Sequence, residues 1–343
     1  MAAALTPLTL LGAPGSPYSR KMRALLRYRR IPHRWVIRNS RHDPAPALPV
    51  PLIPVLLLPG EGGAEPEPMI DSTFQIRRLE ELWHERSVVP SDPALAFLDW
   101  LIEDYADEWL TKAMYHYRWS FEADVDKASK VLPRWSKTSA SDENVAPLSK
   151  LFRERQVGRR GVVGINETTA PLIEDSYRRL LHALDAHLAQ SSFVTGERPG
   201  TADFALFGQL SQLVLFEPTS TALAIEEAPR IVAWCEVVED LSGIEVDDRG
   251  WLDPDAACAT LGGLLAEAGR TYAPFLLANA DAVARGAERV ECRIDGRPWA
   301  QPPFSYQAKC LAWLREAHAG LPDAARSRVD ALLEGSGCEA LFA

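Results

Sequence analysis

The chain has 343 residues, of which 47% are hydrophobic and 24% are charged, and its formal net charge is −10. This length allows two domains with a substantial core, and the composition is typical of a soluble globular protein. The negative charge disfavours nucleic-acid binding, and no apolar run approaches the ~20 residues of a membrane span. We therefore expect neither nucleic acid nor a membrane as a partner.

Basic residues and cysteines are unevenly distributed. Residues 1–83 contain 11 Lys and Arg against 7 Asp and Glu, whereas the remainder contains 26 against 40. The basic excess between residues 20 and 41 could attract an anionic ligand or form a solvated helix face. No Lys or Arg precedes Arg20, so we expect no signal peptide. Five widely spaced cysteines without metal-site spacing predict free thiols in the cytoplasm and no bound metal: Cys235, Cys258, Cys292, Cys310 and Cys338.

The first predicted elements are a short strand at residues 8–11 and a basic helix after a glycine- and proline-rich turn. Ser16 fits the position that caps the helix, and Pro17 fits its first turn. A hydroxyl group is therefore expected at the positive end of a helix, where an anion can be held. The more ordinary interpretation is that Ser16 only caps the helix.

Two further strands and a helix continue this pattern. Residues 33–38 predict a second strand, so that strand, helix and strand form a parallel unit. Residues 52–58 predict a third strand with Pro54 near its start, where a proline does not disturb the ladder. Asp71 or Ser72 would cap the next helix.

Beyond a linker at residues 84–92 the chain is predicted to be helical. Residues 93–121 predict one long helix, in which Tyr115 and Trp119 could line an apolar pocket or pack in the core. Residues 131–166 are less regular and predict a surface excursion. Further on, Gly200 fits the cap of an apolar helix at residues 204–215.

The chain continues well beyond residue 250. Residues 256–269 and 272–286 predict two helices, and Asp295-Gly296 predicts the turn of a short hairpin. Two more helices are predicted at residues 305–318 and 323–334. The purpose of this segment does not follow from its sequence; it could cover a site, extend a dimer or bind something else.

Three of these pieces carry a resemblance to a known family. Ser16-Pro17-Tyr18-Ser19 resembles the Cys-Pro-Tyr-Cys of a glutaredoxin with both cysteines replaced by serine. Followed by Ile53-Pro54, which matches a cis-proline site, and by Asp71-Ser72, it resembles the glutathione S-transferase superfamily, of a serine-type and bacterial-like kind with a C-terminal extension. Gly200 departs from the Ser or Thr usual at that structural motif.

The resemblance implies a fold with three parts. Residues 1–83 would form an α/β thioredoxin-like domain that binds glutathione, and residues 93–249 would form an all-α glutathione-transferase domain. Residues 250–343 would form an extension, mostly helical with a short hairpin. The resemblance also implies a homodimer through the helix from Ser72 and the long helix from Pro93.

The resemblance further implies a glutathione-dependent transferase, with glutathione as co-substrate and an apolar small-molecule electrophile as the second substrate. Ser16 would stabilise the glutathione thiolate, with Tyr18 and Ser19 as rivals for this role, and Tyr18 would also contact the substrate. The backbone of Ile53, before the expected cis bond to Pro54, would hold the tripeptide. Asp71 and Ser72 would bind the γ-glutamyl end, and a basic residue among Arg38, Arg41 and His42 could meet a carboxylate.

A serine hydroxyl at a helix N-terminus can supply the free energy that is needed to stabilise a thiolate. Lowering the pKa of a thiol from about 8.5 by two units requires about 2.7 kcal/mol. A hydrogen bond to a charged group supplies about 1.5–3 kcal/mol, and a helix N-terminus adds about 0.3–1 kcal/mol. Two alternatives stay open. A non-catalytic binding or scaffold protein could have kept the fold, whereas glutathione-dependent reduction is disfavoured because Ser16 and Ser19 cannot exchange disulfides.

Overall fold

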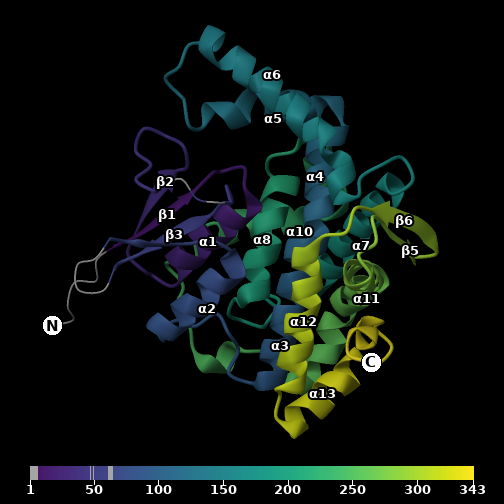
Figure 1. The fold of residues 1–343 in the computed structure, drawn as a ribbon. Coiled ribbons are helices and arrows are strands. Elements are labelled where there is room, and N and C mark those ends of the chain that lie inside the picture. The colour runs from purple at the N-terminus through teal and green to yellow at the C-terminus, as the bar shows by residue number, and fades with distance from the viewer. Residues whose placement is uncertain (1–6, 47, 49, 61–64) are drawn as a thin grey trace, which may run out of the picture.

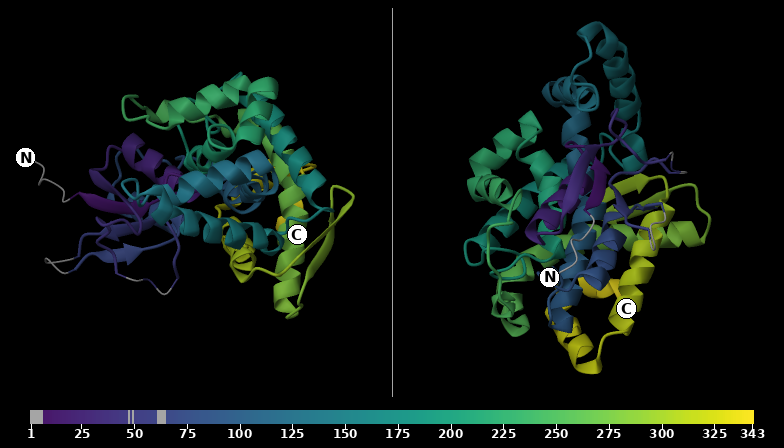
Figure 2. Two further views of the ribbon diagram at one scale, coloured as in Figure 1. Left: turned by 90° about the horizontal axis from the view of Figure 1, so that it is seen from above. Right: turned by 90° about the vertical axis from the view of Figure 1, so that its left-hand side faces the viewer.

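The computed structural model describes residues 7–46, 48, 50–60 and 65–343, with all of their side chains except those of residues 257–259 (Figure 1). The first six residues of the predicted first domain and the side chain of Cys258 therefore lie outside the described part. A small sheet with two helices stands beside a larger helical body, and the C-terminal helices run along that body (Figures 1 and 2).

The N-terminal domain is built on a four-stranded mixed sheet in the order β2-β1-β3-β4. β1 pairs in parallel with β2 and antiparallel with β3, and β4 is antiparallel to β3. The predicted parallel unit of strand, helix and strand is confirmed, and so is the thioredoxin-like fold. The elements are β1 (Leu8–Gly12), α1 (Pro17–Tyr28), β2 (His33–Ile37), β3 (Val55–Leu58), β4 (Glu67–Met69) and α2 (Ser72–Leu82).

The long helix predicted from Pro93 is confirmed, with an internal change of winding. α3 (Pro93–Tyr105) passes into a π-helical segment (Ala106–Leu110) and then into α4 (Thr111–Ser120). π-helical turns are rare and frequently occur at functional sites. Here the π-helical segment turns Asp107 and Glu108 toward the N-terminal domain and the extension, respectively.

The predicted irregular excursion is largely helical, so that prediction is wrong in its detail. α5 (Glu122–Val131) and the 17-residue α6 (Asp142–Gly158) form a projecting pair at the top of Figure 1. Most of α6 is exposed, and its apolar residues are spread around the helix. Its amphipathic period is consequently weak, and the polar 136–144 segment before it obscures the start of the helix.

Four helices complete the central body: α7 (Ala170–Leu188), α8 (Thr201–Leu213), α9 (Pro218–Glu227) and α10 (Pro229–Val238). α8 lies at the centre, and all of its residues are buried. The way in which α8 is capped explains why residue 200 is a glycine. Asp99 of α3 accepts hydrogen bonds from the N–H groups of Thr201 and Ala202, at 3.0 and 2.9 Å. A Cβ atom on Gly200 would lie 2.4 Å from Oδ1 of Asp99, so the capping side chain comes from another helix.

The extension contains a single long helix where two were predicted. α11 (Pro254–Ala284) runs through Pro274 without a break. The predicted hairpin is confirmed as β5 (Val290–Ile294) and β6 (Arg297–Gln301), with positive φ angles at Asp295 and Gly296. α12 (Ser305–Ala319) and α13 (Asp323–Leu333) agree with the predicted helices, and a short 3-10 turn at Cys338–Leu341 follows.

The extension covers part of the surface through which a homodimer was predicted. Phe74 of α2 meets Trp313 of α12 edge to face at 4.9 Å, and Phe97 of α3 lies 5.4 Å from Phe342 between ring centroids. Residues of α11 to α13 belong to the same hydrophobic cluster as the central body. A second subunit could not use this part of α2 and α3 while the extension lies on it.

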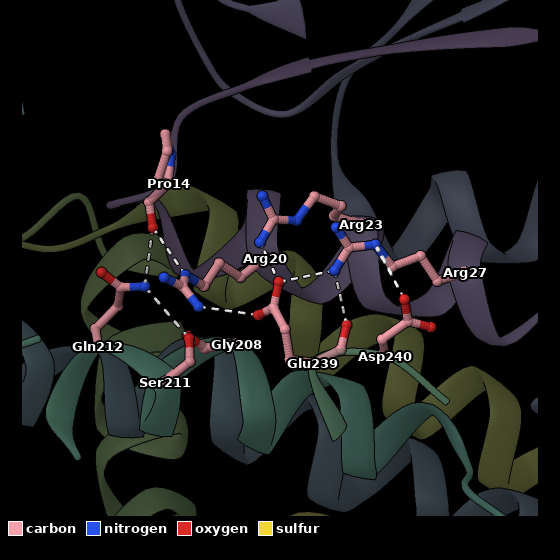
Figure 3. A network of polar contacts seen from close by, with 9 residues as sticks. All are labelled: Pro14, Arg20, Arg23, Arg27, Gly208, Ser211, Gln212, Glu239 and Asp240. Atoms are coloured by element: carbon pink, nitrogen blue, oxygen red, sulfur yellow. Dashed lines mark hydrogen bonds and ion pairs between the residues drawn. The ribbon is translucent and has the colours of Figure 1, made fainter. Parts of the chain in front are cut away.

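The basic face of α1 is used between the domains. Arg20, Arg23 and Arg27 converge on the carboxylate of Glu239 at the end of α10, with nitrogen–oxygen distances of 2.9 Å for Arg20 and 2.8 Å for Arg27 (Figure 3). The predictions of an anion-attracting or solvated helix face are therefore wrong for these three residues. Among the helices of the described ranges, none is long and apolar enough to cross a membrane.

Candidate active site

A cavity of about 650 Å³ lies between the N-terminal domain and the helices α4 to α6. One wall is the turn that follows β1, together with Ser16 and Ile53. The facing wall carries Tyr115 and Trp119 of α4, as predicted, together with aromatic and basic side chains of the excursion. Those are Trp135, Lys137, Phe152 and Arg155.

Ser16 combines the cap with a place on this wall. Its Oγ accepts a hydrogen bond from the N–H of Ser19 at 3.2 Å, and the side chain is 9% exposed. The predicted cap is therefore confirmed. Accepting that bond uses a lone pair and not the hydroxyl hydrogen, so the cap does not consume the donor function of the group.

Ile53 lines the same cavity, and its peptide bond to Pro54 is cis, as the resemblance implied. The antiparallel ladder between β1 and β3 reaches only as far as Leu11 and Val55. Ile53 therefore lies beyond the ladder, at the edge of the cavity. The carbonyl of Pro54 is not free, because Nε2 of Gln75 donates to it at 3.1 Å.

Tyr18 lies elsewhere. Its hydroxyl donates to the backbone oxygen of Asp107 at 2.9 Å, in the interface between α1 and the π-helical segment. Burial, with the nearby carboxylates of Glu108 and Asp107, raises the pKa of Tyr18 well above its usual value. The side chain thus stays neutral and holds the two domains together. Its predicted contact with substrate is not supported by this position.

Of the two predicted candidates Asp71 caps α2, whereas Ser72 is the first residue of the helix, and neither residue lines the cavity. Oδ1 of Asp71 accepts from the N–H of Thr73 at 3.1 Å. Oδ2 accepts from the hydroxyl of Tyr306, in α12, at 2.5 Å. The structure therefore brings Ser16 and Ile53 together in one cavity, whereas Asp71 contacts the C-terminal extension and Ser72 lies outside the cavity lining.

The cavity is lined by four cationic side chains, and no Asp or Glu is among its described lining residues. Two of them are held by neighbours. Arg118 donates to the carbonyl of Gly15 at 2.7 Å and pairs with buried Glu217, and Arg38 pairs with Asp43 at 2.7 Å. The other two, Lys137 and Arg155, are exposed at the rim. A cavity with this charge pattern favours an anionic ligand.

Tyr115 is fixed against the excursion. Its hydroxyl contacts the backbone oxygen and Oε1 of Gln156, at 2.9 and 2.8 Å. Burial raises its pKa although Arg159, Arg118 and other arginines near it act in the opposite sense. The hydroxyl therefore stays protonated and orients the wall of the cavity. Tyr115 therefore contributes an apolar ring to the cavity and no charged group.

Sequence reasoning missed the residues that other segments bring to this region. The basic run at residues 153–160 was visible, but nothing placed it opposite Ser16, because α6 was not predicted. Tyr306 gave no signal, since its partner Asp71 is more than two hundred residues away. Of the predicted basic candidates, Arg38 lines the cavity, whereas Arg41 and His42 do not.

Burial disfavours ionisation of the four cysteines whose side chains the structure describes. Burial raises the pKa of Cys292 to about 11 and that of Cys338 to about 12, and burial also raises the pKa values of Cys235 and Cys310. These four cysteines form no disulfide. Within the described ranges, no group of three or more His, Cys, Asp or Glu residues could hold a metal ion.

Two family models match the chain. Residues 10–87 match the model for the glutathione S-transferase N-terminal domain, and residues 156–236 match that for the glutathione S-transferase C-terminal domain. The two matches support the superfamily assignment and the predicted order of a thioredoxin-like domain followed by a helical domain. Among curated proteins, no sequence matches the chain significantly.

Solved structures similar to this chain include two glutathione transferases and a beta-etherase. A glutathione transferase family member from Pseudomonas fluorescens, with two glutathione bound, is 18% identical over 68% of this chain and 89% of its own, with a TM-score of 0.41. A Tau class glutathione S-transferase from mango is 18% identical over 73% and 95%, with a TM-score of 0.42. A beta-etherase from Sphingobium is 16% identical over 68% and 95%, with a TM-score of 0.46.

Proposed function

We propose that this chain, whose sequence matches the models of both glutathione S-transferase domains, is a glutathione-dependent transferase of the serine type found in bacterial-like members. The observation that carries the proposal is the position of Ser16. Its hydroxyl lies at the N-terminus of α1 and on the wall of a cavity that also contains Ile53 and aromatic side chains. A thiolate in that cavity would meet both a hydroxyl donor and the positive end of a helix.

In the proposed reaction, glutathione loses its thiol proton to water, and the hydroxyl of Ser16 donates a hydrogen bond to the resulting sulfur anion. The sulfur attacks the electrophilic carbon of an apolar second substrate and forms a carbon–sulfur bond. The bond to the leaving group breaks, and that group departs with the electron pair. Ser16 stabilises the nucleophile and forms no covalent intermediate.

The remaining predicted site residues take supporting roles in this proposal. The backbone of Ile53, before cis-Pro54, would pair with the cysteine of glutathione. Asp71 and Ser72 would bind its γ-glutamyl end. The basic lining of the cavity supports an anionic ligand, and Tyr115 and Trp119 offer an apolar surface for the electrophile.

The test is a calorimetric titration with glutathione, accompanied by ultraviolet absorbance of the thiolate. We expect binding to wild type with a thiolate signal, and binding to Ser16→Ala without that signal. Ser16→Asp is the matched control, because aspartate caps a helix as well as serine but repels a thiolate. It should keep the stability of the wild type and lose the signal.

Other results would contradict the proposal. A thiolate signal that persists in both variants would mean that Ser16 is only a cap and that another group activates the thiol. If glutathione does not bind wild type at millimolar concentration, the fold serves another purpose.

A second candidate is a non-catalytic binding or scaffold protein with the same fold. One observation favours it: both carboxylate oxygens of Asp71 already accept hydrogen bonds from the chain itself, from Thr73 and Tyr306. The calorimetric experiment separates the two candidates, since this second function does not require glutathione. A cytoplasmic location belongs to either proposal.

The homodimer that the resemblance implies remains a prediction. Its interface would have to lie outside the part of α2 and α3 that the extension covers. Light scattering of the purified chain, whose monomer mass is 37.9 kDa, tests it directly.

A further inference from the structure

The C-terminal extension reaches the N-terminus of α2 through one side chain. The hydroxyl of Tyr306, in the first turn of α12, donates to Oδ2 of Asp71 at 2.5 Å. Asp71 itself has a φ angle of +75°, and its Oδ1 accepts from the N–H of Thr73. The carboxylate is therefore oriented by its own helix on one oxygen and by the extension on the other.

The hydroxyl of Tyr306 is held in place by its surroundings. Its ring packs against Phe304 and Trp313, with centroids 6.3 and 5.8 Å away. Buried Asn279 of α11 clamps the peptide of Phe304, donating to its oxygen at 2.9 Å and accepting from its N–H at 2.8 Å. Gln307 donates to the carboxylate of Glu108 at 2.9 Å. The start of α12 is thus fixed on both sides of Tyr306.

The phenol of Tyr306 keeps its proton. Burial and the neighbouring carboxylate of Asp71 raise the pKa of Tyr306 above its usual value, so the phenol remains a hydrogen-bond donor. The phenol already occupies one acceptor site of Oδ2, so a ligand amine that is to bind there must displace the phenol or share the oxygen with it. A hydrogen bond to a charged group contributes enough to change an affinity about tenfold or more.

We propose that Tyr306 is a specificity-determining residue of the thiol site, because it competes with the γ-glutamyl amine of glutathione for Asp71. The inference rests on the proposed function, in which Asp71 binds that amine. It assigns to the extension a direct effect on the choice of thiol. Wild type discriminates weakly between glutathione and thiols that lack the γ-glutamyl group, and loss of the hydroxyl increases the discrimination.

Calorimetric titration of the full-length chain with glutathione and with cysteinylglycine, which lacks the γ-glutamyl group, tests this inference. We expect Tyr306→Phe to bind glutathione about tenfold more tightly than wild type and cysteinylglycine with unchanged affinity. The matched control is Tyr272→Phe, since the hydroxyl of Tyr272 makes an equally short bond of 2.5 Å to Asp104 away from the cavity. Its affinity for both thiols should equal that of wild type.

A double variant tests whether Tyr306 acts through Asp71. Adding Asp71→Asn to Tyr306→Phe should abolish the gain in glutathione affinity. In wild type, glutathione binding should accelerate amide hydrogen exchange at the start of α12, because the amine displaces the phenol.

The possible failures are distinguishable. If wild type binds glutathione and Tyr306→Phe binds it equally or more weakly, the competition by Tyr306 is refuted while the proposed function stands. If Tyr306→Phe gains affinity for both thiols equally, Tyr306 acts on access and not on the amine, which also refutes the inference. If no variant binds glutathione, both the proposed function and this inference fall.

Discussion

Ser16 has two roles that a single substitution to alanine removes together. It caps α1 through the N–H of Ser19, and the residue lines the cavity together with Ile53. The cap is a property of the folded chain alone, whereas the proposed thiolate contact exists only with ligand. The two contributions can therefore be measured in separate experiments.

The cap predicts a loss of stability without any ligand. Ser16→Ala should lower the free energy of unfolding by about 1 kcal/mol, and Ser16→Asn should leave it nearly unchanged, because asparagine caps a helix equally well. Urea denaturation monitored by circular dichroism gives both values. An equal loss in the two variants would show that the hydroxyl makes contacts beyond the cap.

At this scale the sequence was informative where a residue acts through its neighbours in the chain. The caps at Ser16 and Asp71 were predicted from local patterns, and the cis bond before Pro54 was implied by the family resemblance. The partner of Asp71 was not, because Tyr306 is brought there by the packing of α11 and α12. Contacts between distant segments leave no periodic signal in a single sequence.

At the scale of elements, α8 shows how a departure from a family motif is compensated. Serine normally caps a helix better than glycine, so Gly200→Ser would be expected to stabilise an isolated helix. Here Asp99 already caps α8 and occupies the space beside Gly200. The side chain that caps α8 therefore belongs to α3.

We therefore expect Gly200→Ser to destabilise the protein, by about 1–3 kcal/mol, as is usual when a packed site is overfilled. Combining it with Asp99→Ala should cost less than the sum of the two single changes, because the new serine regains space and can cap the helix. A thermal-unfolding double-mutant cycle measures this coupling. If Gly200→Ser stabilises the protein instead, the side chain of Asp99 can move away from residue 200 at little cost in free energy.

The interface between α1 and α10 depends on one carboxylate. Glu239 receives Arg20, Arg23 and Arg27 (Figure 3), so Glu239→Gln leaves three neighbouring guanidinium groups without their shared counter-charge. We expect a loss of about 1–2 kcal/mol that shrinks as salt is added. The matched control is Glu245→Gln, whose exposed pair with Arg30 should contribute little to stability. Equal effects of the two changes in urea unfolding would contradict this account.

The elements themselves were mostly predictable. The parallel unit of β1, α1 and β2, the long helix from Pro93 and the hairpin at Asp295 agree with the sequence patterns. α6 was missed because it is exposed on most sides, and α11 was divided in two although Pro274 does not interrupt it. The cavity could not be predicted, since one of its walls comes from α6 and the segment before it.

At the scale of the molecule, buried carboxylates of α3 and the π-helical segment lie where all three parts of the chain meet. Asp107 accepts from Lys21 of the N-terminal domain, whereas Asp104 and Glu108 accept from Tyr272 and Gln307 of the extension. Burial raises the pKa of Asp104 to about 7 and that of Glu108 to about 8. Packing of the three parts against one another is therefore coupled to protonation of these carboxyl groups.

The sign of this linkage follows from the folded and unfolded pKa values. Between about pH 4.3, where an unfolded Glu ionises, and pH 8, folded Glu108 keeps a proton that the unfolded chain releases, so its stability contribution falls as pH rises. We expect the melting temperature of wild type, relative to that of Glu108→Gln, to fall between pH 5 and pH 7. Exposed Glu122→Gln serves as the control and should follow wild type. A difference that does not change with pH would contradict the raised pKa.

One consequence of the contact between Asp71 and Tyr306 concerns dilution. Both residues belong to the same chain, so the tyrosine is present at a fixed effective concentration that does not depend on how much protein is in solution. A covering group supplied by a second subunit would leave as the protein is diluted and its dimer dissociates. In this chain the occupancy of Asp71 should be the same at nanomolar and micromolar protein, and so should the affinity for a thiol ligand.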